Sequence, residues 1–300
     1  MVITSITYRI LVNDEDVTAN LYPYLTSLSI TDNDSDAVDE LTLELNAKFL
    51  RPAHQDKIKV FIEDQFLGLF YVQKTTIRNN QQLSITASST DFSSNVKARH
   101  QANYDDMTLK QVATKIADRN NLAIRSNMNE PASRFEQVNE SDMSFLNRLA
   151  KEHNAIFNIK NDTLYFMKKH TDVPEVEIDI SLCHTVEITY SNKTLYKSCK
   201  ATYQNTKLNK NVSIIVGEGE PQLTKQGHFQ NDDEARIYAE NALKRATKSL
   251  AEGSLSIAGK VIFAGSNLTL DNDVYSITKV SHNINSSGWV TACNFSNASL

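Results

Sequence analysis

The chain has few cysteines and no long hydrophobic run. Only three of its 300 residues are cysteine, Cys183, Cys199 and Cys293, and none is part of a C-x-x-C pair. An odd number of isolated cysteines argues against a disulfide framework and predicts reduced, buried thiols. Apolar runs such as residues 214–216 and 261–264 are far too short to cross a bilayer. The sequence therefore predicts no membrane insertion.

The first residues lack the features of a secretion signal. Residues 1–17, MVITSITYRILVNDEDV, alternate apolar and polar side chains as a strand does. A signal peptide needs a cationic start followed by a continuous apolar stretch, and neither is present. We therefore expect this chain to fold in the cytoplasm.

Clusters of positive charge are also missing. The chain has 31 Lys and Arg residues against 36 Asp and Glu residues, which gives a net charge of -5 at pH 7. No run of basic residues is longer than two. Domains that grip nucleic acid are usually strongly basic on at least one face, so we predict no sequence-specific nucleic-acid binding.

The sequence contains no clear catalytic or metal-binding motif. Its seven histidines are scattered, without an i, i+4 pair on a helix, and it has no G-x-S-x-G. Glu140 and Asp142 are two residues apart, so on a helix their side chains diverge and capping is the better interpretation. We predict no catalytic residue, no metal and no cofactor, although the many carboxylates leave a glycosidase open.

One acidic stretch has the spacing of a calcium loop at its start. Asp32, Asp34 and Asp36 alternate as the first ligands of such a loop would. The sixth position is Ala37 instead of Gly, and the twelfth is Leu43 instead of Glu. We therefore interpret the stretch as a solvated turn between two strands and as a candidate exposed interface loop.

Apolar and polar residues alternate through residues 4–92. Leu41, Leu43 and Leu45 share one face, with polar neighbours on the other. Turn residues such as Asn, Asp and Gly separate six strand candidates, at residues 5–13, 25–33, 39–46, 56–64, 67–75 and 82–89. This spacing is typical of a small antiparallel barrel or sandwich.

Helical periodicity begins after residue 106. Residues 107–121 carry an apolar stripe, and Asp105 or Asp106 is the expected cap of this helix. A second amphipathic helix follows, with an apolar stripe formed by Met143, Phe145, Leu146, Leu149 and Ala150. Asn139 or Ser141 is its expected cap, Asp142 lies in the first turn, and Asn154 is expected to end it.

The second helix runs directly into a predicted hairpin. Phe157, Ile159, Leu164 and Phe166 form its apolar face, and Asn161-Asp162 supplies a two-residue turn. No residue of the helix or hairpin is a proton donor or a nucleophile with a catalytic partner nearby in the sequence. We therefore interpret residues 139–166 as a structural joint.

Strands resume in the C-terminal half, around a third helix at residues 231–251. The strand candidates are residues 175–179, 184–191, 197–205, 211–219, 254–263, 267–284 and 288–296. The predicted fold class is α+β, mainly β, with two small antiparallel β-barrel domains bridged by an α+β domain. The expected domains are a first barrel at 1–92, a middle domain at 93–167 plus 226–250, and a second barrel at 168–225 plus 251–300.

Three stretches together resemble a known family. They are residues 24–46, residues 137–166, and residues 239–270 continuing into 275–295. In this order and spacing they are similar to the late control D proteins of bacteriophages, the baseplate hubs of contractile tails. They are also similar to the hub part of type VI secretion spike proteins. The family motif falls on Glu140, Ser141, Asp142, Phe145, Leu146, Arg148 and Leu149.

The resemblance implies a structural tail protein without enzymatic activity. Hubs of this kind assemble as homotrimers, so that two barrels per chain give six in a ring between the sixfold tail tube and the threefold spike. The expected partners are the tail tube protein, the central spike protein and baseplate wedge proteins. The expected location is the tail baseplate of a virion, prophage or tailocin particle, after folding and assembly in the cytoplasm of the bacterial host.

Two departures from the family pattern limit what can be carried over. Asn154 replaces the usual Gly after the helix, and the sequence ends at Leu300 without a needle or lysozyme-like extension. Any spike or lytic function of larger relatives therefore cannot be carried over to this chain. Two alternatives stay open: a tail-associated cell-wall hydrolase and a monomeric carbohydrate-binding accessory module.

Overall fold

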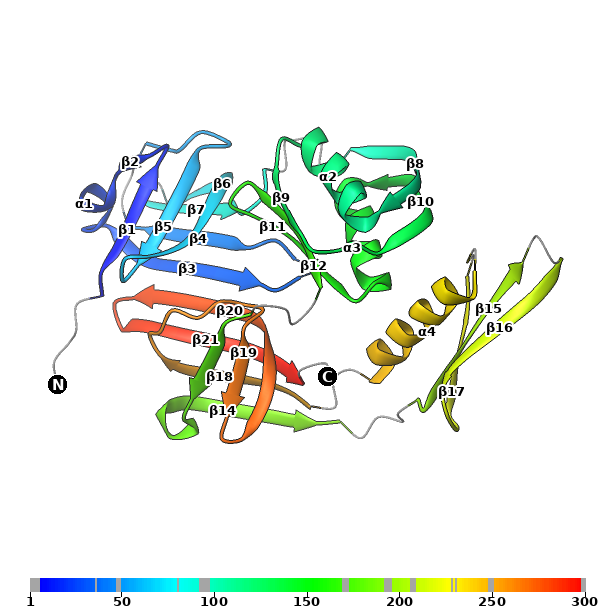
Figure 1. Cartoon of the computed structure of the whole chain (residues 1–300). Coiled ribbons are helices and arrows are strands. Elements are labelled where there is room, and N and C mark those ends of the chain that lie inside the picture. The colour runs from blue at the N-terminus through cyan, green and yellow to red at the C-terminus, as the bar shows by residue number, and fades with distance from the viewer. Residues whose placement is uncertain are drawn as a thin grey trace.

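A computed structural model describes residues 6–35, 37–46, 50–79, 81–91, 98–168, 173–191, 196–205, 209–227, 229, 231–247 and 251–297. Strands dominate this part of the chain, with short helices between them (Figure 1). The predicted α+β, mainly β class is therefore confirmed. The elements form four units, which we call the first β unit, the middle unit, the outer unit and the second β unit.

The first β unit contains the six predicted strands and one short addition. Its strands run in the order β3-β4-β7-β6-β5-β1-β2, and its core contains Leu41, Leu43 and Leu45. The alternation in this segment therefore predicted the buried face correctly. The bounds are β1 Tyr8–Val12, β2 Glu15–Asp16, α1 Thr18–Leu21, β3 Leu25–Asn33, β4 Glu40–Leu45, β5 Lys57–Ile62, β6 Gln65–Arg78 and β7 Gln82–Ser88.

The second β unit has its own core but shares a sheet with the first. Residues 279–285 of β20 pair antiparallel with residues 27–33 of β3, which makes one 13-stranded sheet. Strand pairings among the described residues do not close into a ring, so the predicted barrels are not seen as closed barrels. The bounds are β13 Glu175–Ile178, η2 Ile180–Leu182, β14 Cys183–Tyr190, β18 Ala251–Ala258, β19 Asn267–Leu270, β20 Asp273–Asn285 and β21 Gly288–Asn297.

Several tight turns are made by Asn, Asp and Glu residues in the left-handed region. Both turn residues have positive φ in Asn13-Asp14, Glu63-Asp64 and Asn161-Asp162. A two-residue turn with positive φ at both positions matches the right-handed twist of the two strands that it connects. Asn and Asp tolerate this conformation better than most side chains, so these residues set the hairpin registers.

The middle unit packs two helices against two small sheets. Strands β9, β12 and β11 form one sheet and β8 pairs with β10 in the other. The cap of α2 is Thr108, which forms a capping box with Gln111. The predicted caps Asp105 and Asp106 are wrong, because both residues lie within β8. The bounds are β8 Arg99–Thr108, α2 Leu109–Arg119, β9 Ala123–Ser126, β10 Pro131–Ser141, α3 Asp142–Glu152, β11 Ala155–Lys160 and β12 Thr163–Lys168.

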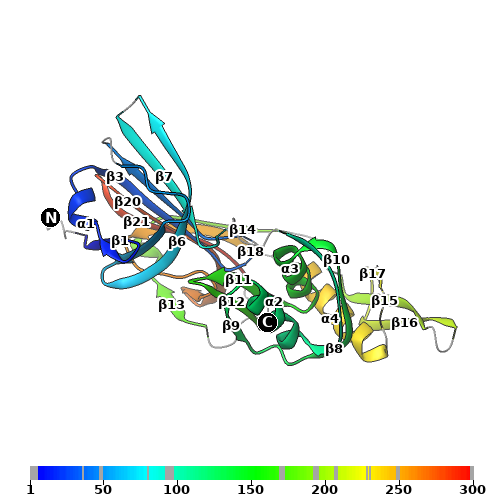
Figure 2. The ribbon, with the colours of Figure 1, turned by 90° about the horizontal axis from the view of Figure 1, so that it is seen from above.

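The outer unit lies at one end of the molecule, beyond the middle unit in both views (Figures 1 and 2). Helix α4 packs Ala235, Ala239 and Ala242 against Ala201 and Tyr203 of a three-stranded sheet. Strands β15, β16 and β17 form a sheet of their own, whereas the predicted domain bounds divide this unit between the second barrel and the middle domain. The bounds are β15 Ser198–Asn205, β16 Lys210–Gly217, β17 Gln222–Gln226 and α4 Asp232–Thr247.

Candidate functional site: the joint of the middle unit

The predicted helix and hairpin are confirmed as α3, β11 and β12. Ser141 caps α3 by accepting a hydrogen bond from the Ser144 N–H at 3.2 Å. Asn154 has a φ of 49°, as expected of a residue that ends a helix in the left-handed conformation. The hairpin pairs residues 155–160 with residues 163–168 around the Asn161-Asp162 turn.

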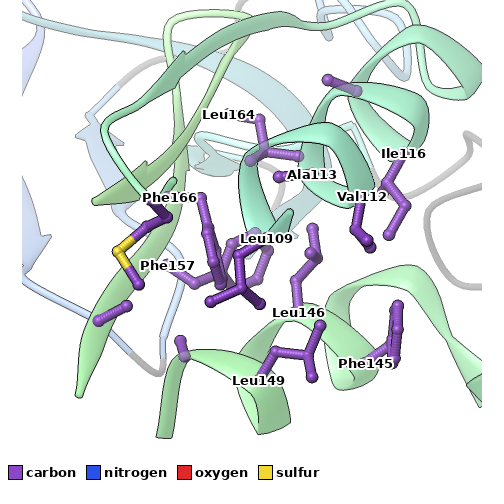
Figure 3. Packing of buried hydrophobic residues seen from close by; sticks show 14 of the residues in the cluster. Leu109, Val112, Ala113, Ile116, Phe145, Leu146, Leu149, Phe157, Leu164 and Phe166 are labelled. Carbon is purple, nitrogen blue, oxygen red and sulfur yellow. The ribbon is translucent and has the colours of Figure 1, made fainter. Parts of the chain in front are cut away.

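Apolar side chains of the family motif form the inside of the middle unit. Phe145, Leu146 and Leu149 are almost completely buried. Figure 3 shows the two leucines pointing from α3 toward Leu109 of α2 and the aromatic side chains of the hairpin. Phe145 also stacks on Tyr104 of β8, with ring centroids 5.5 Å apart. These three residues therefore hold the helices and both sheets of the unit together.

Asp142 is a buried carboxylate with a full set of donors. It is 1% exposed and pairs with the guanidinium of Arg119. Its carboxylate also accepts hydrogen bonds from Asn120 Nδ2 at 2.7 Å and from Gln137 Nε2 at 2.9 Å. Buried charges are tolerated when they are paired and hydrogen-bonded in this way. Asp142 therefore ties α2, β10 and α3 together, a role beyond the predicted helix capping.

The other polar motif residues form a surface ion-pair group. Arg148 Nη2 lies 2.7 Å from Glu140 Oε1, and its Nη1 lies 3.4 Å from Glu152 Oε1. The same Nη2 donates to the carbonyl of Glu136 at 2.8 Å. Glu140, just before α3, thus pairs with Arg148 of that helix. It is not paired with Asp142 as a second catalytic carboxylate would be.

The second face of the hairpin is polar, and it contacts the first β unit. Asn158 Nδ2 donates to the Asn33 carbonyl at 2.8 Å, and Asn158 is only 5% exposed. The turn contributes as well, because Asn161 Oδ1 accepts the Leu69 N–H at 2.8 Å. Tyr71 donates its hydroxyl hydrogen bond to Asp162. The predicted turn residues therefore also attach the hairpin to the first β unit.

Lys160 lies at the centre of this attachment. Its ammonium contacts the Asp32 carboxylate and lies 3.2 Å from Asp39 Oδ2. Burial raises the pKa of Asp39 to about 6, with the Lys160 charge opposing the shift and the Asp32 charge adding to it. Burial would lower the pKa of Lys160, but the two carboxylates outweigh burial and raise it.

The candidate interface loop is less exposed to solvent than predicted. Asp32 is 6% exposed, so its prediction as an exposed residue is wrong. Its Oδ2 accepts the Ala264 N–H from the second β unit at 2.8 Å, which places Asp32 where three units meet. Asp34 is half-buried, and its N–H donates to the Thr278 carbonyl at 3.1 Å. Asp36 lies outside the described residues.

We call the Asp32, Asp39, Asn158, Lys160, Asn161 and Asp162 contacts the polar joint. The sequence analysis identified Asn161 and Asp162 only as turn residues. The polar joint was not predictable, because Asp32 and Lys160 are 128 positions apart. The available signal was the position of Asp32, which follows Leu28 and Ile30 on the buried face of β3.

The described part of the chain contains neither a cluster of metal ligands nor a membrane-spanning helix. No group of three or more His, Cys, Asp or Glu side chains there is arranged to hold a metal ion. None of the helices of that part combines the length and the hydropathy needed to span a bilayer.

The buried polar contacts of the joint connect three units of one chain. Comparisons with known proteins show which proteins share this arrangement. No family model matches the chain. Two relatives do, and both are named probable baseplate hub proteins. The one from Escherichia phage 186 is 22% identical over an alignment of 353 positions, and the one from Escherichia phage P2 is 24% identical over the same length. Each alignment covers 95% of this chain and 91% of the relative.

Solved structures show the same fold. The 43 kDa tail protein of prophage MuSo2 from Shewanella oneidensis has a TM-score of 0.77 at 13% identity, with 98% of each chain covered. A tail protein from Neisseria meningitidis also reaches 0.77, at 12% identity, covering 97% of this chain and 96% of that chain. The c3393 protein of E. coli, a type VI secretion component described as structurally similar to T4 tail proteins gp27 and gp5, has a TM-score of 0.61 at 10% identity. That match covers 98% of this chain and 77% of that chain.

The resemblance inferred from the sequence is therefore confirmed. This chain is similar over nearly its whole length to baseplate hub and tail proteins of phages and prophages. These relatives are structural proteins and not enzymes, in agreement with the predicted absence of enzymatic activity.

Proposed function

We propose that this chain is the hub of a contractile-tail baseplate, a homotrimer that adapts the sixfold tail tube to the threefold central spike. One observation carries the proposal. The chain contains two β units with separate cores, and these are joined edge to edge within one sheet. Three such chains supply six β units, so one face of the ring can follow sixfold symmetry while the chain itself repeats three times.

In this arrangement each β unit supplies one barrel-like element of the ring. The link between the units inside a chain is continuous hydrogen-bonded backbone, with residues 279–285 of β20 opposite residues 27–33 of β3. A side-chain contact, Ser29 Oγ to Asn283 Oδ1 at 2.7 Å, adds to it. A fixed angle between the two units is what a ring of six near-equal elements requires.

The polar joint supports the same function. Because Asp32 contacts both Lys160 of the middle unit and Ala264 of the second β unit, it restrains all three units at one point. Directional hydrogen bonds between buried groups specify one orientation, since any other leaves them unpaired. The joint would thereby set the relative orientation of the β units before the ring assembles.

The proposed partners are the tail tube protein on the sixfold side and the central spike protein on the threefold side, with baseplate wedge proteins around the ring. The proposed site of action is the virion tail baseplate, with assembly in the bacterial host cytoplasm. The full-length similarity to phage baseplate hub proteins supports this placement.

Light scattering on the purified chain over a concentration series tests the proposal. The expected particle mass is three times 33.7 kDa, either at all concentrations or as the limit reached at high concentration. Electron micrographs of the trimer should then show a ring with six densities. A monomer at every concentration that remains monomeric with tube and spike proteins present would contradict the hub function. A melting shift of such a monomer with glycans would favour the accessory-module alternative.

A further inference from the structure

The polar joint brings an amine, a carboxyl carbon and a proton carrier together. Lys160 Nζ contacts the carboxylate of Asp32, and Asp39 Oδ2 lies 3.2 Å from the same nitrogen. We propose that this cluster forms an intramolecular amide bond between Lys160 Nζ and Asp32 Cγ, with Asp39 transferring the protons. The bond would link the middle unit covalently to the first β unit, whatever the assembly state of the protein.

Proximity is the first argument. The three groups come from the end of β11, from β3 and from the residue directly before β4, so each is attached to a strand. Asn33 N–H donates to Asp39 Oδ1 at 2.8 Å, and Ala264 N–H donates to Asp32 Oδ2 at 2.8 Å. Holding reacting groups in contact replaces a bimolecular encounter by an intramolecular step, which removes a large part of the entropic barrier.

The surroundings favour the neutral product. Asp32 is 6% and Asp39 is 7% exposed. A cavity of about 200 Å³ beside them is lined by Phe66, Phe70 and Phe263 as well as the charged groups. Charges cost free energy when they are removed from water. The Lys160 side chain is 24% exposed, so its ammonium is only partly removed from water. Converting this ammonium and the buried Asp32 carboxylate into an amide removes both charges from the site, so desolvation favours the product.

Two groups are placed to lower the barrier. The Ala264 N–H donates to Asp32 Oδ2, the oxygen that gains negative charge when Lys160 attacks the carboxyl carbon. Burial raises the pKa of Asp39 to about 6, close to neutral pH, which suits a group that first accepts and then donates a proton. The raised pKa of Lys160 makes the free amine scarce, so the reaction is slow. It needs to occur only once in each chain.

The step balances without an outside reagent. Asp39 takes one proton from the Lys160 ammonium, and the free Nζ electron pair forms the bond to Asp32 Cγ. The Cγ–Oδ1 bond of Asp32 breaks, and Oδ1 leaves as water after receiving the proton from Asp39 and a second proton from Nζ. The products are one amide, one water molecule and the Asp39 carboxylate, with no change of oxidation state.

Mass spectrometry of the full chain tests the proposal directly. After the purified folded protein is kept near neutral pH for several days, its intact mass should be lower than the sequence mass by one water molecule. A tryptic digest of the denatured protein should contain one branched peptide that joins the segments of Asp32 and Lys160, with no cleavage after Lys160. The matched control is Lys160→Arg, which keeps the positive charge but should show no loss of water.

Two further variants identify the chemistry. Asp39→Asn should fold but form the bond about a hundredfold more slowly, because the proton carrier is lost. Asp32→Asn should expel ammonia in place of water, which excludes dehydration elsewhere in the chain. A wild-type protein that keeps its full sequence mass and is cleaved after Lys160 would overturn the proposal and leave the cluster as an ion pair only.

Discussion

The middle unit is attached differently on its two sides. Toward the first β unit, the polar joint inserts Lys160 between two buried carboxylates and adds hydrogen bonds from Asn158 and Asn161. Toward the outer unit, the middle unit borders a cleft of about 1170 Å³, and Asn241 Nδ2 of α4 donates to the Glu152 carbonyl at 3.0 Å. One side is a fixed joint and the other is an open contact.

Ion pairs are placed differently on the two sides. The cleft is lined by Glu136 and Glu152 from the middle unit and by Asp233 and Glu234 from α4. On the wall formed by the middle unit, Arg134 pairs with Glu136 and Arg148 pairs with Glu152, so both cations bind carboxylates of their own unit. In the polar joint, Lys160 of the middle unit pairs with carboxylates of the first β unit. The comparison teaches that an ion pair joins two units only where its partners come from both of them.

The largest expected effect comes from removing the cation of the joint. Lys160→Met leaves Asp32 and Asp39 buried without their partner, and breaking a buried pair in this way costs about 3–5 kcal/mol in the free energy of unfolding. The matched control is Lys57→Met, because Lys57 forms a half-exposed pair with Asp162 at 3.5 Å and should cost less than about 1 kcal/mol. Urea unfolding of both variants, against freshly purified wild type in which Lys160 is still an ammonium, measures the difference. Equal effects would show that the joint is not locked by Lys160.

Titration of Asp39 is expected to have a smaller effect. Its pKa rises from 3.8 in the unfolded chain to about 6 in the fold, so the protonated form is favoured by folding. The corresponding stability is fully present below about pH 4 and is lost as the pH rises through about 6, by about 1–3 kcal/mol. The charged groups that face Asp39 are Asp32 and Lys160.

Asp39→Asn serves as the reference for this titration, because other carboxylates of the chain titrate in the same range in both proteins. The stability of the wild type relative to Asp39→Asn should fall between pH 4 and pH 6. Urea unfolding at several pH values measures it. A difference that stays constant with pH would show that Asp39 keeps an ordinary pKa.

The smallest effect is expected on the open side. Asn241→Ala removes one hydrogen bond to a carbonyl at a partly open contact and should cost about 0.5–1 kcal/mol. The matched variant in the joint is Asn158→Ala, where loss of the bond leaves the Asn33 carbonyl without its donor and should cost about 1–3 kcal/mol. Thermal unfolding compares the two. A larger effect from Asn241 would reverse the assignment of fixed and open sides.

Local structure was largely predictable from the sequence, because helix stripes and turn residues depend only on neighbouring positions. The stripe of Phe145, Leu146 and Leu149 identified α3 and its buried face, and Asn161-Asp162 identified the hairpin turn. The cap of α2 was missed although Thr108 and Gln111 carry the capping-box signal, because the preceding aspartates were given more weight. Strands β8 and β10 were missed as well, since helical patterns follow both of them directly.

Long-range features were not predictable, for a physical reason. Nothing near Asp32 indicates that a lysine 128 positions later will neutralise it, so its spacing with Asp34 and Asp36 suggested exposure. The outer unit was missed because strands of all β units have the same alternation. Its separation depends on the small Ala235, Ala239 and Ala242 side chains, which fit α4 closely to its own sheet.

Strand β20 belongs to two units at once. Its first residues pair with β19 of the second β unit, and its later residues pair with β3 of the first. No linker separates the two units at this point. A force applied to one unit is therefore carried to the other along covalent backbone, and the two can change their angle only by shearing the hydrogen bonds of a strand or bending it. The two β units therefore act as one rigid body, which the polar joint connects to the middle unit.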